Sequence, residues 1–464
     1  MTIKVYNSLT DKKEEFKPQK ENFVSMYVCG ITPYDFVHLG HARAYVAFDI
    51  IKRHLIKRGF EVRHIQNFTD IDDKIIKRAQ EKNISPAALA DIYINDYFEQ
   101  TDKLNILKAD KYPRVTETMT EIINFIKVLY DNGFAYQKNG DVYFSVDKFK
   151  EYGKLSKRKT EDLKSGARVD INDDKASPVD FALWKRTKDG EPDSVSWDSP
   201  WGKGRPGWHI ECSVMSSSIL GDTIDIHGGG LDLVFPHHEN EIAQSEAKSG
   251  KQFVKYWLHN GFVTVNKEKM SKSLGNFFTL KDILQKYDAR VVRYYLLTQH
   301  YKSPLDFSDA SLDGAKNALQ GLDDAYLKLL SRTNSSSEIK DSRLIKMYEN
   351  FMSVLDDDFS SEKAIALLHE LKGFLLTEFA FGGQGLFELF SEMKTLFEEM
   401  MDSLGISLPK LPEDNDIKML LKERNAARKA KDWGRADKLR KEIDAIGYKI
   451  TDNPDGSSVL TKKI

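Results

Sequence analysis

Cysteine is scarce in this chain: among its 464 residues only Cys29 and Cys212 are cysteines, and 183 positions separate them. No CxxC pair is present, so the usual spacing of a structural zinc site is missing. Two unrelated buried thiols are the ordinary interpretation of stray cysteines in a reducing compartment. A metal site that other residues complete is the second interpretation, and the spacing alone does not decide between them.

The sequence also lacks a run of about 18 apolar residues that could span a bilayer. Its first ten residues contain no apolar signal-peptide segment, and its last four match no lipidation signal. We therefore expect a cytoplasmic protein with no membrane partner. The formal net charge is only −2, so a nucleic-acid partner must be sought in local charge patterns. A hydrophobic content of 41% predicts a globular core, and the length predicts two to four domains.

Two α/β halves are predicted. Residues 23–30 and 61–68 have strand character and flank a helical pattern at 38–58, an arrangement typical of a parallel βαβ unit. The second half has similar elements, predicted as a strand at 222–227, a glycine turn at 228–230, a helix at 236–248 and a strand at 256–265. Between the halves, 80–130 looks helical and 131–205 has the short strand and turn signals of an insertion.

The remainder of the chain is predicted to be helical over 308–404, followed by a proline-containing linker at 407–414. The tail is basic, with 13 Lys and Arg against 7 Asp and Glu in 417–464. Two basic helices there could bind RNA, with Trp433 stacking on an unpaired base. A solvated amphipathic hairpin explains the same charges equally well.

The string His38-Leu39-Gly40-His41 lies at the first predicted strand-to-helix joint. A helix N-terminus attracts phosphates, Gly40 permits close approach of a nucleotide, and the two histidines share a helix face. An ordinary helix start with two solvated histidines is the alternative, and four residues alone favour that alternative.

A second string, KMSKS, occupies 269–273, about 230 residues further along. Lys269 and Lys272, beside Met270, form a cationic loop that can stabilise a leaving pyrophosphate, or merely a solvated basic turn. Both strings together, in this order, resemble the double signature of class I aminoacyl-tRNA synthetases. The resemblance implies that His38, His41, Lys269 and Lys272 stabilise charge during catalysis and, with Gly40 and Met270, bind ATP.

Further strings resemble the cysteinyl-tRNA synthetases over almost the whole chain. They are CGITPYD at 29–35, NFTDIDDKIIKR at 67–78, FALWK at 181–185, GRPGWHIECS at 204–213, DIHGGGLDLVFPHHENEIAQ at 225–244 and the tail around 432–437. The family implies an amino-acid pocket of Thr32, Thr69, Trp208 and His227, although Trp208 as an ordinary core residue stays possible. It also implies an adenosine segment of Gly229, Gly230 and Asp232, and anticodon contacts from Arg428, Trp433 and Asp437.

The metal interpretation of the cysteines gains two ligands from the predicted helix at 236–248. His237 and Glu241 are four apart and share a face, whereas His238, turned about 100° away, is expected not to join them. Cys29 ends the first strand and Cys212 precedes the strand of the second half, and the two halves meet at a topological switch point. With His237 and Glu241 they form a mixed sulfur, nitrogen and oxygen set suited to zinc, and the family implies these four positions. Two buried thiols beside a surface His–Glu pair are the alternative.

Zinc has a chemical purpose in this family, because shape alone separates cysteine poorly from serine. A thiolate binds zinc, whereas a hydroxyl ionises too weakly to compete. The prediction is therefore an α/β protein that ligates L-cysteine to tRNA(Cys) through an adenylate, with one Zn²⁺ per chain, Mg²⁺ with ATP, and no obligate protein partner. Its predicted parts are a Rossmann-like catalytic domain at 1–130 and 206–307, an insertion at 131–205, a helical bundle at 308–406 and a basic anticodon-binding domain at 407–464.

Three rival functions stay open at the level of the sequence. A cysteine ligase acting on a small amine, as in mycothiol-pathway relatives, would share the core but lack the basic tail. A non-catalytic paralogue that binds RNA or zinc should have lost ligands or signature lysines, and none is missing. Another nucleotidylyltransferase of the HxGH type would need neither the Cys, His and Glu set nor the tail.

Overall fold

A four-stranded parallel sheet forms the centre of the computed structural model. The structure describes residues 2–161, 175–265, 268–269, 278–333, 335–381, 386–409, 415–452 and 458–462. The strand order is β10-β9-β3-β4, with bounds Val254–Asn260 for β10, Ile224–Gly230 for β9, Phe23–Val28 for β3 and Glu61–Gln66 for β4. Each half runs outward from the adjacent central pair β3 and β9, so the predicted topological switch point is present between these two strands.

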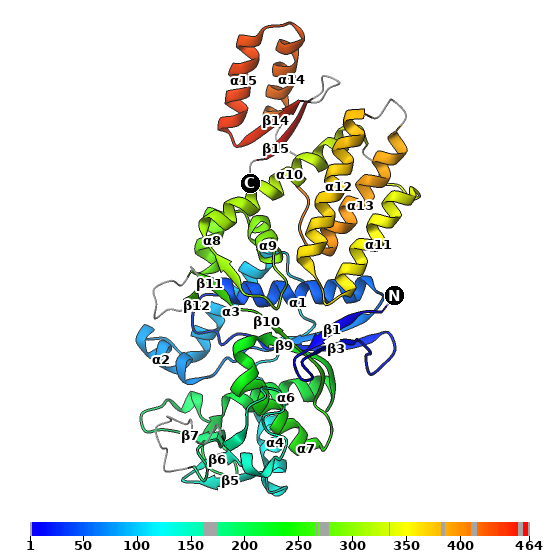
Figure 1. Ribbon diagram of the computed structural model, residues 1–464. Helices are drawn as coiled ribbons and strands as arrows, with labels where there is room; N and C mark the ends of the chain where they lie inside the picture. The colour runs from blue at the N-terminus through cyan, green and yellow to red at the C-terminus, as the bar shows by residue number, and fades with distance from the viewer. Residues whose placement is uncertain are drawn as a thin grey trace.

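Helix α1, Leu39–Lys57, connects β3 to β4 and completes the predicted βαβ unit. Most of its residues are buried because it lies between the sheet and the helical bundle (Figure 1). Its buried residue Phe48 packs against β9, where a Cβ added to Gly228 would approach a ring carbon of Phe48 to 2.1 Å. Glycine at position 228 therefore permits the close packing of helix and strand that the Rossmann-like arrangement requires.

The glycines 228–230 are not a turn, as predicted, but the last residues of β9, and they pair with Leu258, His259 and Asn260 of β10. The predicted strand at 256–265 is two strands, since β10 ends at Asn260 and β11 begins at Val263. The strand β11 belongs to a second small sheet of order β12-β11-β13. Both differences arise because the buried glycines keep an extended conformation, whereas the chain turns at 261–262.

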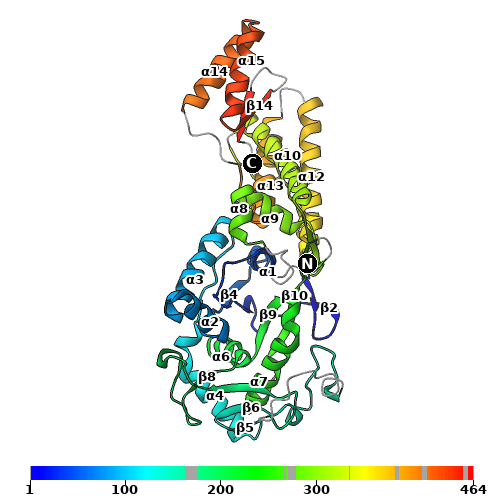
Figure 2. The same ribbon diagram turned by 90° about the vertical axis from the view of Figure 1, so that its left-hand side faces the viewer.

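Along the sequence, several helices and an antiparallel sheet lie between β4 and β9, the strands that end the first half and begin the second half of the catalytic sheet. The helices are α2 (Asp73–Lys82), α3 (Pro86–Lys103), α4 (Met119–Asp131) and α6 (Trp208–Leu220). The sheet has the order β5-β6-β7-β8, with bounds Ala135–Lys138, Asp141–Phe144, Phe181–Arg186 and Gly204–Pro206. It lies at the end of the molecule opposite the C-terminal domain (Figures 1 and 2). The predicted helical stretch 80–130 thus contains a non-helical segment between α3 and α4.

The predicted helix at 236–248 is preceded by a π-helical turn. Residues Val234–His238 form that turn, and α7 runs from Glu239 to Ser249. Shorter elements complete this part of the chain, namely the hairpin β1 (Lys4–Asn7) and β2 (Lys12–Glu15) and the 3-10 turns Val115–Glu117, Val146–Lys148, Asp193–Val195 and Leu231–Leu233.

Helices after the second half form the predicted bundle. They are α10 (Asp309–Arg332), α11 (Ser342–Asp356), α12 (Ser361–Phe381) and α13 (Phe387–Ser403), and they follow α8 (Leu280–Lys286) and α9 (Ala289–Leu297), which belong to the second half. The strands β12 (Glu268–Lys269) and β13 (Leu305–Phe307) flank β11. Within the stretch 308–404, residues 333 and 335–338 are not helical, and residues 382–385 lie outside the described residues.

Buried charged groups join the bundle to the catalytic sheet. Asp49 of α1 pairs with Arg293 of α9 and, at 2.8 Å, with Arg53. The Arg293 guanidinium also donates to the carbonyl oxygen of Leu404, just after α13, at 2.8 Å. These guanidinium groups hold the pKa of the buried Asp49 carboxyl below its usual value despite the opposing effect of burial. The end of the bundle is therefore fixed to α1.

A separate small core forms at the C-terminus, where two helices pack on a hairpin. The helices are α14 (Asn415–Lys429) and α15 (Trp433–Ala445), and the strands are β14 (Tyr448–Asp452) and β15 (Ser458–Lys462). The two helices were predicted and the hairpin was not. This domain contacts α10, where Lys449 forms an ion pair with Asp324 at 2.7 Å (Figure 1). Within the described residues, none of the helices is long and apolar enough to cross a membrane.

Candidate active site and metal centre

The carboxyl ends of the parallel strands open into a cavity of about 590 Å³. It is lined by Cys29, Gly30, Ile31, Thr32, Tyr34, Asp35, Phe36, His38, Gly40, His41, Ala44, Tyr45, Lys74, Trp208, Gly229, Gly230, Asp232, Leu233, Asn260, Gly261, Phe262 and Val263. Residues predicted for ATP, for the amino acid and for the metal thus share one cavity, although they come from both halves of the chain. Open α/β sheets bind their ligands at this edge, beside the switch point.

The two histidines of the HLGH string lie side by side at the N-terminus of α1. His38 is the N-cap residue, and its Nδ1 accepts a hydrogen bond from the backbone N–H of His41 at 3.3 Å. The His41 Nδ1 accepts reciprocally from the backbone N–H of His38, and the two rings stack with centroids 3.6 Å apart. The helix start thereby presents two imidazoles to the cavity, where a phosphate would also meet the positive end of the helix.

The four predicted metal ligands come together at the floor of the cavity, although they lie on separate elements. Cys29 follows β3 and Cys212 is in α6, and their sulfurs are 3.9 Å apart. The Glu241 carboxylate of α7 lies 3.8 Å from the Cys29 sulfur and 3.0 Å from Nε2 of His237. Cys212 precedes β9, the strand of the second half, and lies in the helix α6, which was not predicted from the sequence.

The geometry and chemistry of this cluster fit zinc. Ligand atoms of Cys29, Cys212, His237 and Glu241 all lie within 4.8 Å of one another. A tetrahedral zinc with Zn–S bonds of about 2.3 Å separates two sulfurs by roughly 3.8 Å, close to the observed spacing. Oε2 of Glu241 is enclosed and has no hydrogen-bond partner, so a carboxylate oxygen is left for a cation.

Burial and hydrogen bonding set the ionisation of the cluster residues. Burial raises the pKa of the Glu241 carboxyl and of the Cys29 thiol well above their usual values. A hydrogen bond from Cys29 lowers the pKa of Cys212 to about 7, against the effect of burial. A cation would favour the ionised form of every one of these groups.

His238, which was expected not to join His237 and Glu241, is absent from the set that contains His237 but lies close to Cys29. Its Nε2 lies 3.3 Å from the Cys29 sulfur, and with His227 it forms a second set of ligand atoms around Cys29 and Glu241. The reason is that His238 is three residues before Glu241, a spacing that also shares a helix face. On the other side of the ring, Nδ1 of His238 lies 2.8 Å from Nε2 of His259.

The residues predicted for the amino-acid pocket divide into two groups. Thr32 and Trp208 line the cavity, and the half-exposed Trp208 indole stacks on His237 with centroids 4.3 Å apart. Thr69 and His227 are buried behind the cavity wall. The backbone N–H of Thr69 donates to the carbonyl of Ile31, so Thr69 lies directly behind the segment that lines the cavity.

The sequence analysis missed three residues that the structure adds to this region. Lys74 lines the cavity with its ammonium group over the Tyr34 ring. The Asn67 side chain accepts from the backbone N–H of Gly30 at 2.9 Å and lies 3.7 Å from the Cys212 sulfur. Glu211 accepts a hydrogen bond from the Thr69 hydroxyl. Their only signal was membership of the strings 67–78 and 204–213, which gave no role to a single residue.

Part of the KMSKS string falls outside the described residues. Met270 and Lys272 are not described, and Lys269 is described only as a backbone position at the end of β12. The strand β12 pairs with β11, which in turn pairs with β13. The roles of Lys269, Met270 and Lys272 in binding ATP stay predictions.

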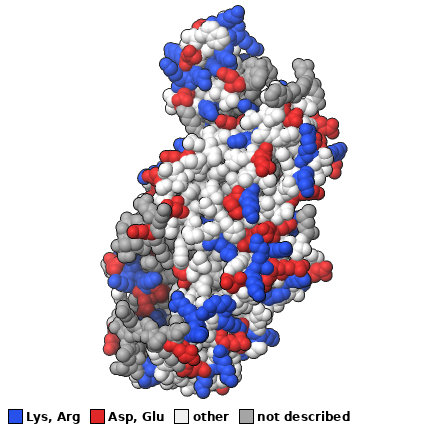
Figure 3. Space-filling view, in the orientation of Figure 1, with Lys and Arg blue, Asp and Glu red and all other residues white. Residues whose placement is uncertain are grey.

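The predicted anticodon residues lie in the C-terminal domain, far from the cavity. Trp433 is 59% exposed at the start of α15, and Asp437 is exposed one turn later. Arg428 of α14 pairs with Asp452 of β14 at 2.5 Å. Lys and Arg side chains crowd this domain at the top of Figure 3, as the charge count of the tail predicts. An exposed indole among cations is suited to an unpaired base and its phosphates.

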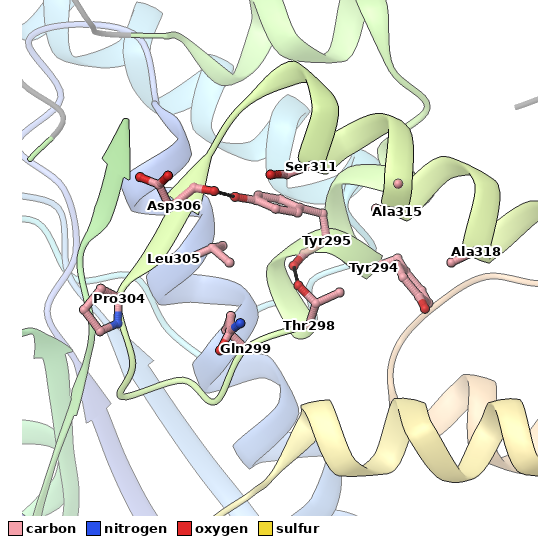
Figure 4. A pocket seen from close by; sticks show the side chains of 11 residues that line it. Tyr294, Tyr295, Thr298, Gln299, Pro304, Leu305, Asp306, Ser311, Ala315 and Ala318 are labelled. Atoms are coloured by element: carbon pink, nitrogen blue, oxygen red, sulfur yellow. Dashed lines mark hydrogen bonds between the residues drawn. The ribbon is translucent and has the colours of Figure 1, made fainter. Parts of the chain in front are cut away.

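A second cavity, of about 440 Å³, lies between α9, α10 and the segment before β13 (Figure 4). Its hydroxyl groups serve the fold: Tyr295 donates to the carbonyl of Asp306 at 2.9 Å, and Thr298 donates to the carbonyl of Tyr295 at 2.7 Å (Figure 4). The Tyr294 hydroxyl lies 2.8 Å from Nε2 of His369. This cavity contains none of the residues predicted for catalysis, and we assign it no function.

Comparisons with known proteins agree with this geometry. Residues 15–317 match the family model described as tRNA synthetases class I (C) catalytic domain. A methionyl-tRNA synthetase from Mycobacterium tuberculosis, solved with methionyl-adenylate, superimposes with a TM-score of 0.60 at 15% identity over 82% of this chain and 89% of that chain. The fold and the family model define a class I aminoacyl-tRNA synthetase.

The particular family follows from the remaining matches. Residues 409–458 match the model described as Cysteinyl-tRNA ligase anticodon binding domain. The cysteine–tRNA ligase of Endomicrobium trichonymphae is 64% identical over 100% of both chains, and that of Geobacillus sp. is 47% identical over 98% of both. This chain belongs to the cysteine–tRNA ligase family.

Proposed function

We propose that this protein ligates L-cysteine to tRNA(Cys) in two steps that consume ATP. The observation that carries the proposal is the buried set of Cys29, Cys212, His237 and Glu241 at the floor of a cavity whose mouth holds the HLGH histidines. The Cys, His and Glu set would bind the sulfur of an amino-acid side chain, and the histidines at the entrance of the cavity would bind the phosphates of a nucleotide. The identity to curated cysteine–tRNA ligases supports the same substrates.

In the first step, the carboxylate of cysteine attacks the α-phosphate of ATP in line, an acyl adenylate forms, and pyrophosphate leaves. Catalysis here is mainly positioning and stabilisation of charge. His38 and His41 donate to phosphate oxygens from the start of α1, while Gly229, Gly230 and Asp232 receive the adenosine. Lys269 and Lys272 neutralise the leaving pyrophosphate, and Mg²⁺ accompanies ATP as its counter-ion.

The metal set accounts for selection of cysteine over serine. Cys29, Cys212, His237 and Glu241 would hold Zn²⁺, which lowers the pKa of a thiol and binds the thiolate in a way that a hydroxyl does not match. Trp208, stacked on His237, closes the side of the pocket and excludes water. Selection by ligation needs no second, hydrolytic site.

In the second step, the 2′-hydroxyl of the terminal ribose of the tRNA attacks the anhydride and AMP leaves. Arg428, Trp433 and Asp437 contact the anticodon from the basic C-terminal domain. We divide the chain into a catalytic domain at 1–130 and 206–307, an insertion at 131–205, a bundle at 308–406 and the anticodon domain at 407–464. A tRNA substrate fits action in the cytoplasm as a single chain.

The test is ATP–pyrophosphate exchange that depends on the amino acid, with cysteine and with serine as the two substrates. It is run on metal-replete protein and on protein stripped with a chelator and then reloaded with zinc. We expect exchange with cysteine only, loss on stripping and recovery with zinc. No exchange with cysteine in the zinc-loaded protein would reject the proposal and favour a non-catalytic protein that binds RNA or zinc.

A cysteine ligase that acts on a small amine is disfavoured by the match of residues 409–458 to an anticodon-binding domain. The same enzyme preparation distinguishes the two functions, since a tRNA ligase transfers radiolabelled cysteine to tRNA transcripts and an amine ligase does not.

A further inference from the structure

Two aromatic rings in the loop before α1 each have a lysine over one face. The ammonium group of Lys74 lies 5.4 Å from the centroid of the Tyr34 ring, and that of Lys281 lies 5.6 Å from the centroid of the Phe36 ring. Both rings are half-buried and both lysines are exposed. Tyr34, Phe36 and Lys74 line the cavity, whereas Lys281, in the first turn of α8, does not. These four residues, here called the aromatic rim, therefore begin in the cavity and continue outside it.

The rings of the aromatic rim are held from behind by the helices α2 and α3. Phe36 packs edge-on against the buried Tyr93 ring of α3, with centroids 5.2 Å apart. Tyr34 and Phe36 both pack on one small core, which consists of Ile75, Ala79, Leu89 and Tyr93. Each ring thus has one side fixed by the protein, and the rim needs no ligand to keep its shape.

The position of Lys74 is fixed by its neighbour in the sequence. Asp73 forms ion pairs with Lys185 of β7, at 2.8 Å, and with the buried Arg205 of β8. Burial raises the pKa of the Asp73 carboxyl, but Lys185 and Arg205 outweigh that effect and lower it to about 2. The start of α2 is therefore tied to the inserted sheet, and Lys74 is held beside the cavity.

The charges of the two rim lysines are not neutralised by the protein. Within the described part of the chain, neither Lys74 nor Lys281 forms an ion pair, and each has a ring face as its partner. Among the described residues that line the cavity, Lys74 is the only Lys or Arg. A cation–π contact at an exposed site is weak, so an incoming flat group can take the ring face while the ammonium group moves to an anion beside it.

This combination of groups is the one that binds single-stranded nucleic acids. Bases stack on aromatic side chains, and neighbouring cations neutralise the phosphates between the bases. Lys281 lies outside the cavity, so a ligand that contacts the whole rim must extend from the cavity to the surface. A nucleotide enclosed in the cavity does not do this, whereas a polynucleotide whose end enters the cavity does. Figure 1 shows α2 and α8, which carry the two lysines, on the same side of the molecule.

We propose that the aromatic rim binds the unpaired nucleotides at the 3′ end of the tRNA and so guides the terminal ribose to the adenylate. This inference rests on the proposed function, and it adds an RNA contact at the cavity to the one at the C-terminal domain. Every base has a flat face, so the rim accepts the tRNA end without reading its sequence. The four residues position the tRNA and take no part in the formation of the adenylate.

The test compares two tRNA(Cys) transcripts, one intact and one that lacks the unpaired 3′ nucleotides, on the zinc-loaded full-length protein. Dissociation constants are measured for the wild type, for Phe36→Leu and for Lys74→Gln. Phe36→Leu keeps an apolar contact with Tyr93 and removes the stacking surface. Loss of one base–aromatic stack corresponds to about 5- to 150-fold in affinity, which we expect for the intact transcript, with a change below about 2-fold for the shortened one.

The salt dependence of binding gives a second measurement. One phosphate contact on a single strand contributes about −0.7 to the slope of log K against log salt concentration, so Lys74→Gln should make that slope less negative by about 0.7 for the intact transcript only. Lys77→Gln is the matched control. Lys77 is exposed on the same helix, does not line the cavity and lies over none of the described rings, so its loss should affect both transcripts alike. Should Phe36→Leu fail to fold, the exposed Lys74 still provides the test.

Equal effects of Phe36→Leu and Lys74→Gln on the two transcripts, or no effect on either, would overturn the assignment. So would a KM for ATP that Lys74→Gln raises in pyrophosphate exchange, a reaction without tRNA, since it would place Lys74 at the triphosphate. A wild type that exchanges pyrophosphate with cysteine confines any such failure to the aromatic rim. A wild type that supports no exchange means that the proposed function itself has failed.

Discussion

Arg43, one turn after the HLGH string, gives a prediction that connects stability to catalysis. Its guanidinium, 2% exposed, donates to the carbonyl oxygens of Leu296, Gln299, His300 and Ser303. No described carboxylate forms an ion pair with it, so the carbonyl dipoles at the end of α9 compensate the charge. Burial lowers the pKa of Arg43 to about 10, which leaves the residue charged at neutral pH.

The change Arg43→Met keeps an unbranched apolar stem and removes the guanidinium with all of its donors. Breaking a buried charged contact typically costs about 3–5 kcal/mol, because the groups left behind stay desolvated. Arg43→Lys should be intermediate, since one ammonium cannot reach all four carbonyls in the geometry of a guanidinium fork. Lys57→Met on the same helix is the control. Lys57 is 26% exposed and pairs with Glu399, so its loss should cost at most about 1 kcal/mol.

Native-state hydrogen exchange of peptides from α1 and α9 is the appropriate assay, because several cores unfold in this chain and a single Tm would mix them. The segment held by Arg43 leads into β13, which pairs with β11 beside the KMSKS string. A shift of about 1 Å in such a segment can cost roughly 100-fold in rate. We therefore expect Arg43→Met to lower the kcat of pyrophosphate exchange with little change in the KM for cysteine.

The reasoning is refuted if the hydrogen-exchange protection of α1 and α9 in Arg43→Met differs from that of the wild type by less than about 1 kcal/mol. Such a result would mean that carbonyl dipoles do not stabilise a buried guanidinium in this protein. A loss of stability with an unchanged kcat would instead separate the packing role of Arg43 from the alignment of the two signature strings.

Three further predictions concern other sites. Gly405→Ala should destabilise the protein by at least about 3 kcal/mol in denaturant unfolding, because φ is +60° and the new Cβ would lie 2.1 Å from Nη2 of Arg293; a neutral effect would contradict the rigidity of this contact. Burial lowers the pKa of His64 to about 3. Between pH 6.5 and 3, therefore, the unfolded state binds a proton at His64 and the folded state does not. As the pH is lowered through this range, the free energy of unfolding should decrease by up to about 1.4 kcal/mol per pH unit. His64→Leu should reduce the pH dependence of the free energy of unfolding by the contribution of one proton, and an equal pH dependence in variant and wild type would contradict this role of His64. Metal analysis after dialysis against a weak chelator should show that Cys212→Ser loses zinc and that His238→Gln retains it. The reverse order would favour the set of Cys29, His227, His238 and Glu241 as the zinc ligands.

The fold was predictable where the sequence has a clear period. The strand at 23–30 and the helix at 38–58 agree with β3 and α1 to within two residues at each end. The helix α6 was not predicted because apolar and small residues of its own sequence are spread around the whole helix, so its sequence has no clear polar face. The hairpin at 448–462 was also missed, although the string NPDG at 453–456 is a turn signal.

The site was predictable as a set of residues but not as a set of distances. The string 225–244 identified His237 and Glu241, and the resemblance supplied both cysteines. The spacing of three residues between His238 and Glu241 allows a shared helix face, but the contact of His238 with Cys29 also depends on how the π-helical turn meets α7.

The buried charges at Asp49 have a consequence for protein engineering. Excising residues 308–406 would remove the Leu404 carbonyl that accepts a hydrogen bond from Arg293, the buried partner of Asp49, so the residues before and after 308 are not interchangeable modules. The C-terminal domain has its own small core and meets α10 at the half-exposed Lys449–Asp324 pair. Grafting another RNA-reading domain should therefore succeed at a junction near 407, where the exchange would disturb surface contacts and leave the buried charges intact.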